Sequence, residues 1–158
     1  RSLMKRLLSA ILLLAFTTLA TLAENELFKQ CENIKNVTTT YIGPSMLRYA
    51  ATSCMDYGIS PSATNNLDDI TVINADDKIS ADQVRKHLKQ YESRLKYNLI
   101  MKTKDDDEET RILQGQGRDK KYELMVVKDE GDEISIVILT STTSFDEMKN
   151  VFMPGLFN

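Results

Sequence analysis

The stretch Tyr122–Thr140, YELMVVKDEGDEISIVILT, decides the fold more than any other part of the chain. It contains two runs rich in aliphatic and β-branched residues, Tyr122–Val127 and Glu133–Thr140, which is the composition of strands. The polar residues between the runs include Gly131, which supplies a turn. We therefore expect a β-hairpin here.

The same two strands are unusual because both of their faces are apolar. Tyr122, Leu124 and Val126 point one way, Met125 and Val127 the other, because side chains alternate along a strand. A sheet covered on one face only would show polar alternation on the other. Either helices cover both faces, or one face meets a partner.

Two further strands, Tyr97–Thr103 and Thr110–Gly115, precede the hairpin and extend it to a four-stranded antiparallel meander. The acidic run Asp105–Glu109 (DDDEE) falls at the first bend. A calcium loop would need acidic residues at alternating positions and a glycine to fold the loop around the ion. These acids are consecutive, so we interpret the run as a solvated turn.

The helix Ser80–Lys96 precedes the meander. Ser80 and Gln83 have the spacing of a capping box, and His87, the only histidine, is expected to face solvent. One apolar stripe runs along the helix at spacings of four, three and four: Val84, Leu88, Tyr91 and Leu95.

The remaining elements alternate between helix and strand. In chain order we expect a helix over Glu24–Ile34, a strand over Val37–Ile42, a helix from Pro44 to about Met55, a strand over Asp69–Asn74 and a helix over Ser144–Phe152. The inward face of the second helix would carry Met46, Leu47, Ala50 and Cys54. Together these elements predict one α+β domain over residues 24–158, with a mixed, largely antiparallel sheet of about six strands and three to four packed helices.

Residues 1–23 have the pattern of a secretory signal peptide. Three basic residues surround Met4, the uncharged run Leu7–Ala23 follows, and charge resumes at once after Ala23. A membrane anchor is the alternative, but about 20 strongly apolar residues would be needed. We expect cleavage after Ala23, or else after Ala20, giving a periplasmic or secreted protein with no stable membrane anchor.

Charge and cysteine content limit the partners and cofactors. Removing the three basic residues of the leader lowers the formal net charge from −3 to −6, which gives no reason to expect nucleic acid as a partner. An oxidising compartment permits a disulfide between Cys31 and Cys54, the only two cysteines. The alternative is two buried thiols. With one distant histidine they cannot form a zinc site, so we expect no metal or cofactor.

Three longer segments carry a resemblance to a known family: YIGPSMLRYA, LDDITVINADDKISADQVRKHLKQY and YELMVVKDEGDEISIVILTSTTSFDEMKNV. Together with the basic, apolar leader, they resemble the DUF4252 family of exported Bacteroidetes proteins. The chain departs from the usual family pattern at Gly43-Pro44 and in having Cys31 and Cys54. The resemblance implies export and a fold outline, and it implies no activity.

Two hypotheses of function follow. The first is a non-enzymatic binding or signalling-accessory module of the envelope, whose partner is an envelope protein or a small ligand. The alternative is a small exported hydrolase that uses acidic residues, because two carboxylates brought together by the fold leave no sequence motif. A serine hydrolase elbow and a phosphate-binding glycine loop are both missing from the sequence. We therefore assign no catalytic residue.

Overall fold

The computed structural model describes residues 25–49, 66–117 and 120–144. The described elements are α2 (Glu26–Cys31), β1 (Val37–Ile42), α3 (Pro44–Tyr49), β2 (Asp69–Ala75), α6 (Lys78–Leu95), β3 (Asn98–Asp105), β4 (Glu108–Gln116), β5 (Tyr122–Asp129) and β6 (Ile134–Ser141). The predicted leader, the second half of the helix ending near Met55, Cys54 and most of the C-terminal helix lie outside the described residues. The predicted strands all form, with ends that differ by two residues or fewer.

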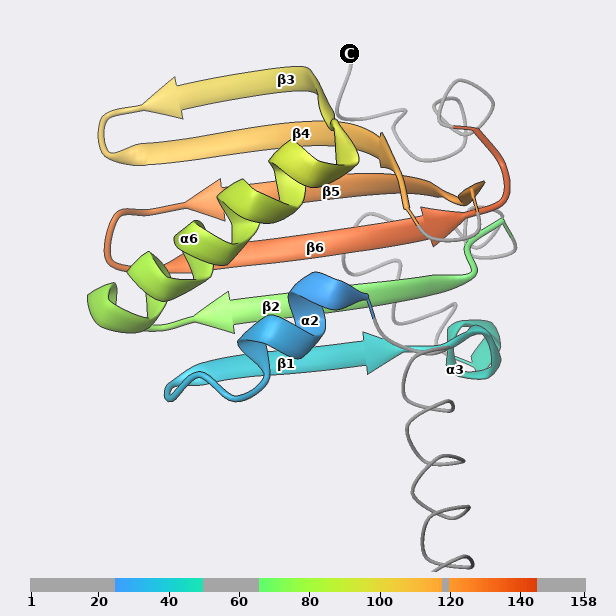
Figure 1. Cartoon of the computed structure of the whole chain (residues 1–158), viewed down its shortest axis with the longest axis horizontal. Coiled ribbons are helices and arrows are strands. Elements are labelled where there is room, and N and C mark those ends of the chain that lie inside the picture. Colours follow the sequence, from blue (N-terminus) through green and yellow to red (C-terminus); the bar gives the residue numbers. More distant parts are fainter. Residues whose placement is uncertain (1–24, 50–65, 118–119, 145–158) are drawn as a thin grey trace, which may run out of the picture.

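The strands form one open sheet in the order β1-β2-β6-β5-β4-β3 (Figure 1). Every described pairing between neighbouring strands is antiparallel, which corrects the prediction of a mixed sheet. The reason is that β2 and β3, which run in the same direction, are not neighbours. The meander that starts at β3 returns across the sheet and places β6 beside β2.

One face of the sheet is covered by α2 and α6, and α6 crosses this face diagonally on its way from β2 to β3 (Figure 1). The principal core lies between these helices and the sheet. It includes Val84, Leu88 and Tyr91 from the predicted stripe, with Leu95 packed against them. The helix therefore buries the face that its periodicity indicated.

A second apolar cluster involves the alternate set of strand residues. Leu113, Met125 and Val127 belong to the core under the helices, whereas Ile112 and Leu124 belong to the second cluster. The predicted division of the strand side chains between two apolar faces is thus confirmed.

The start of α6 differs from the prediction. Asp77 is the N-cap, and its carboxylate accepts a hydrogen bond from the Ser80 N–H at 2.9 Å. Ser80 lies inside the first turn, where its hydroxyl donates to the Asp77 carbonyl at 3.0 Å. The helix thus begins one turn before the predicted capping box, because Asp77 satisfies the backbone donors first. His87, expected to face solvent, is half-buried.

Two local features of the turns match the sequence. The residues between β3 and β4 are Asp106 and Asp107, so the acidic run does form the first bend of the meander. Gly131 adopts φ 86° in the turn between β5 and β6, a conformation that a residue without Cβ adopts readily.

On α3, however, Leu47 is buried while Met46 is 62% exposed, so the prediction that Met46 faces inward is wrong. The described helix ends at Tyr49, and this short helix presents Met46 to solvent.

Candidate functional site

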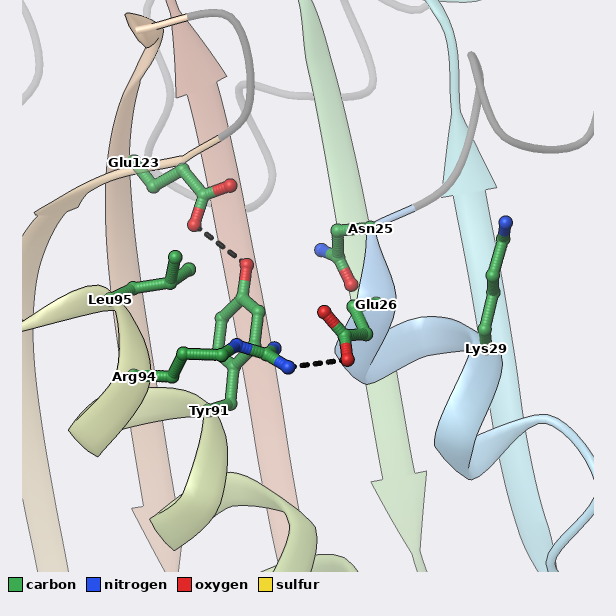
Figure 2. A pocket seen from close by; sticks show the side chains of 7 residues that line it. All are labelled: Asn25, Glu26, Lys29, Tyr91, Arg94, Leu95 and Glu123. Carbon is green, nitrogen blue, oxygen red and sulfur yellow. Dashed lines mark hydrogen bonds and ion pairs between the residues drawn. The ribbon is translucent and has the colours of Figure 1, made fainter.

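A pocket of about 320 Å³ opens between α2, α6 and the first residues of β5 (Figure 2). Its lining residues come from three elements: Asn25, Glu26 and Lys29 at α2, Tyr91, Arg94 and Leu95 on α6, and Glu123 on β5. The volume is at the lower end of the range for small-molecule sites. The pocket is therefore the first place to look for chemistry in the described chain.

Glu123 is the most unusual residue of the pocket because its side chain is charged and only 5% of its surface is exposed. The Tyr91 hydroxyl donates to Glu123 Oε2 at 2.9 Å, and the Tyr97 hydroxyl donates to the same oxygen. The two phenol rings lie 5.7 Å apart between centroids, with a tilt of 40°. A buried carboxylate is costly unless it is hydrogen-bonded, and this arrangement supplies one donor from α6 and one from the connection between α6 and β3.

Two glycines of β4 and its end provide the space for this cluster. A Cβ at Gly115 would lie 2.7 Å from the Tyr97 ring, and a Cβ at Gly117 would collide with the Glu123 carboxylate. Any larger residue would displace one of the two side chains. Burial, followed by the nearby Glu123 charge, raises the pKa of Tyr97, so its phenol stays protonated and acts as a donor.

The rim of the pocket is charged. Arg94 Nη1 lies 2.5 Å from Glu26 Oε1, an ion pair that joins α6 to α2 (Figure 2). Both side chains are about half exposed, so the pair adds little stability. Asn25 caps α2, because its side-chain oxygen accepts the Phe28 N–H at 2.7 Å. The pocket thus has a buried carboxylate inside and an exposed ion pair at its rim.

A second surface lies on the other side of the sheet. We call it the outer face and define it by the half-buried residues of the second cluster: Ile42, Val72, Ile100, Met101, Val126 and Val137. Beside it, α3 contributes Leu47 to the same cluster and presents Met46 and Tyr49 to solvent, 62% and 87% exposed. Most of this cluster is shielded from solvent, because its core members are 1–6% exposed: Leu47, Leu67, Ile70, Ile112, Leu124 and Leu139. The accessible apolar groups are the half-buried residues named above together with Met46 and Tyr49.

The residues singled out in the sequence are mostly structural. Cys31 is fully buried on α2, and burial raises the pKa of its thiol to about 11. Because Cys54 lies outside the described residues, the disulfide stays a prediction. Two aspartates that flank β2 are also structural: Asp77 caps α6, and Asp68 lies 3.6 Å from the Lys121 ammonium.

Within residues 25–49, 66–117 and 120–144, no group of three or more His, Cys, Asp or Glu side chains is placed to hold a metal ion. None of the helices in these same ranges combines the length and the apolar character needed to cross a bilayer.

Residues 28–151 match the family described as "Domain of unknown function (DUF4252)". The chain belongs to the DUF4252 family. The match spans most of the chain, including the six strands that the structure describes, and it confirms the resemblance noted in the sequence. Neither a search of curated proteins nor a search of solved structures returned a match for this DUF4252 chain.

Glu123 was visible in the sequence only as a polar exception on a buried strand, and nothing connected it to the tyrosines. The signal that could have found the cluster is a combination of three features. They are a glutamate in an apolar strand, a tyrosine in the apolar stripe of the helix, and paired glycines at the end of the neighbouring strand. Each is common alone, and only the strand order brings them together.

Proposed function

We propose that this DUF4252 chain is exported, loses residues 1–23 and acts in the envelope as a non-enzymatic binding or signalling-accessory module that holds a partner protein against its outer face. The support for export is the basic start followed by the apolar run Leu7–Ala23. Mass spectrometry of the secreted protein checks this step, and retention of Leu7–Ala23 in that form would contradict it.

The observation that carries the binding proposal is the position of Met46 and Tyr49. Large apolar side chains this exposed are informative when further apolar side chains lie beside them, because exposed apolar patches mark interaction sites. Here they extend from α3, whose Leu47 already packs in the cluster of the outer face. Aromatic residues and methionine are also enriched where proteins meet.

The shape of the outer face favours a protein over a small molecule. Its half-buried residues come from β1, β2, β3, β5 and β6, so the surface spans most of the sheet. The half-buried hydrophobic residues that define it are aliphatic side chains and one methionine. A partner with an apolar surface of similar breadth fits this chemistry.

The experiment is affinity capture from envelope extract with three variants of the mature domain. Met46→Asp and Tyr49→Asp place a charge on the proposed interface, and each should lower the affinity for the captured protein at least about tenfold. Ile79→Asp is the matched control. Ile79 is a large apolar residue that is 75% exposed, like Met46 and Tyr49, but it lies on the first turn of α6, away from the proposed interface. Equal binding by all three variants and the parent would overturn the proposal.

The hydrolase alternative has one observation in its favour: two carboxylates, Glu26 and Glu123, line the same pocket. A hydrolase panel run beside the capture experiment decides between the two functions. Turnover that disappears in Glu123→Gln would replace the binding proposal with the catalytic one. We expect no turnover, because Arg94 neutralises Glu26 and two tyrosines already hold Glu123.

A further inference from the structure

The sheet is open, so it has two edges, which are formed by β1 and β3 (Figure 1). Among the described strands, β1 pairs only with β2, and β3 pairs only with β4. The outer side of an edge strand carries backbone donors and acceptors that can pair with another chain, and proteins usually protect such edges with charges, prolines or bulges. The two edges of this sheet differ in that protection.

The edge at β3 is protected in two ways. Its register with β4 shifts between Leu99 and Met101, as at a β-bulge. Beyond that point the strand carries Lys102 and Lys104, and both residues are exposed. An incoming strand would meet an irregular backbone and two ammonium groups, so β3 is a poor template for pairing.

The edge at β1 has none of these devices. Its six residues, VTTTYI, include no charged residue and no proline. They pair with β2 over the whole length of the strand without a shift of register. Thr38 and Thr40 are exposed, so the middle of this strand is accessible to another chain. A flat, uncharged and accessible edge favours the addition of a further strand.

We propose that β1 is a dimerisation edge, which pairs antiparallel with β1 of a second copy of this chain, with Thr39 on the two-fold axis. Residues directly opposite each other must both point their hydrogen-bonding groups toward the partner or both away from it, so a strand that pairs with its own copy is centred on a residue. The centre at Thr39 places Thr38 of each copy opposite Thr40 of the other. Cross-strand threonine pairs are favourable, and the symmetry forms this pair twice.

The β1 strand of the second copy is a better partner than its β3 strand. Pairing of β1 with β3 would leave a free edge at each end and build an open filament. It would also bring Lys102 and Lys104 of one copy against the uncharged strand of the other. Pairing of β1 with β1 uses the unprotected edge of both copies and leaves only the protected ones, so assembly stops at the dimer.

The pairing has a consequence for the outer face. A strand added at the edge continues the sheet, and the two-fold axis between antiparallel strands is perpendicular to the sheet. The same face of each copy therefore lies on the same side of the dimer, which presents two outer faces together and lets a partner engage both. The proposal goes beyond the binding function and does not depend on export.

The test is sedimentation equilibrium of the purified protein in the form that the cell accumulates. A contact through one strand of six residues is at the small end of specific interfaces, so we expect a dimer with a dissociation constant of about 1–100 µM. Chain concentrations from about 1 to about 500 µM bracket that range.

Two double variants test where the contact lies. The lysine variant carries Thr38→Lys and Thr40→Lys, and the glutamate variant carries Thr38→Glu and Thr40→Glu. Each places like charges opposite each other across the axis, so each should weaken its own dimer at least about tenfold. An equal mixture of the two should form a heterodimer, because every opposing pair then joins opposite charges. Thr40→Lys and Thr40→Glu, each a single change at an exposed position, replace the double variants if these do not fold.

Thr103→Lys is the matched control. Thr103 is also an exposed threonine on an edge strand, opposite Thr110, but it lies on β3, so this change should leave the dimer intact. Circular dichroism confirms that each variant is folded.

Four results would overturn the proposal. They are a parent that stays monomeric over the whole range, a lysine variant that dimerises as tightly as the parent, a mixture that forms no heterodimer, and loss of the dimer in Thr103→Lys. A monomeric parent is also the result expected if β1 pairs with a strand of another protein instead. None of these measurements involves an envelope partner, so capture through Met46 and Tyr49 is tested separately.

Discussion

Arg85 on α6 forms a two-pronged ion pair with Asp129 at the end of β5: Nε donates to Oδ2 at 2.8 Å and Nη2 donates to Oδ1 at 2.7 Å. The residues are far apart in sequence, and the pair fixes the first half of the helix against the turn that follows β5. Gly131 strengthens the site, because its N–H donates to Asp129 Oδ1 at 3.0 Å. Such charge-assisted pairs add geometric specificity as well as energy.

Asp129→Asn should lower the free energy of unfolding at pH 7 by about 1–2 kcal/mol, because the pair loses its charge and one of its acceptors. The Arg85 guanidinium holds the pKa of Asp129 below its usual range. Stability from a lowered pKa is present above the unfolded pKa and is lost as pH falls through the folded value. The difference between the two proteins in urea denaturation should therefore shrink below about pH 4. A difference that stays constant from pH 7 to pH 3 would contradict this account.

Leu88→Ala should cost about 2–5 kcal/mol of unfolding free energy, because Leu88 is buried in the core between α6 and the sheet. Lys89→Ala, on the exposed side of the same helix, is the control and should change stability by less than about 0.5 kcal/mol. Urea denaturation measures both. A loss for Leu88→Ala as small as that of the control would show that the stripe does not carry the core.

The helix α6 shows which features of a fold can be predicted from local sequence and which cannot. The apolar stripe depends only on the spacing of residues along the helix, so the prediction of the buried side was correct. The start was wrong because Asp77 and Ser80 are both good capping residues three positions apart, and the sequence alone does not rank them. In the structure the Asp77 carboxylate accepts the Ser80 N–H, which makes Asp77 the cap.

The sheet topology and the pocket could not be predicted from local sequence. A strand, a helix and another strand suggested some parallel pairing, yet β3 forms the far edge and β6 returns beside β2. The Glu123 cluster depends on that order, because it joins Tyr91 on the crossover helix to Gly115 and Gly117 at the end of β4. No pattern within any single element specifies such a contact.

Gly115→Ala should destabilise the domain by about 1–3 kcal/mol, because the new Cβ would lie 2.7 Å from the Tyr97 ring and push it away from Glu123. Gly43→Ala is the control: its Cβ would be 3.4 Å from Tyr41, an ordinary contact, and should change stability by less than about 0.5 kcal/mol. Thermal unfolding followed by circular dichroism measures both variants. Equal melting temperatures would mean that the Tyr97 ring is not confined by β4.

Cys31 should be nearly unreactive in the folded protein, because its side chain is fully buried and the pKa of its thiol is raised to about 11. At pH 7 only about one thiol in ten thousand would be ionised, and the thiolate is the reactive form. A Cys54→Ser variant isolates this thiol. Its alkylation by iodoacetamide at pH 8 should be at least about a hundredfold slower in buffer than in urea.

The control for this measurement is a chain with both native cysteines replaced by serine and a new thiol at the exposed position of Lys89, as Lys89→Cys. That thiol should react at similar rates with and without urea, so a comparably fast reaction of Cys31 in buffer would contradict its burial. The same assay on the parent, unfolded without reductant, tests the disulfide prediction. Two thiols per chain mean that Cys31 and Cys54 remain separate, and none means that export has joined them.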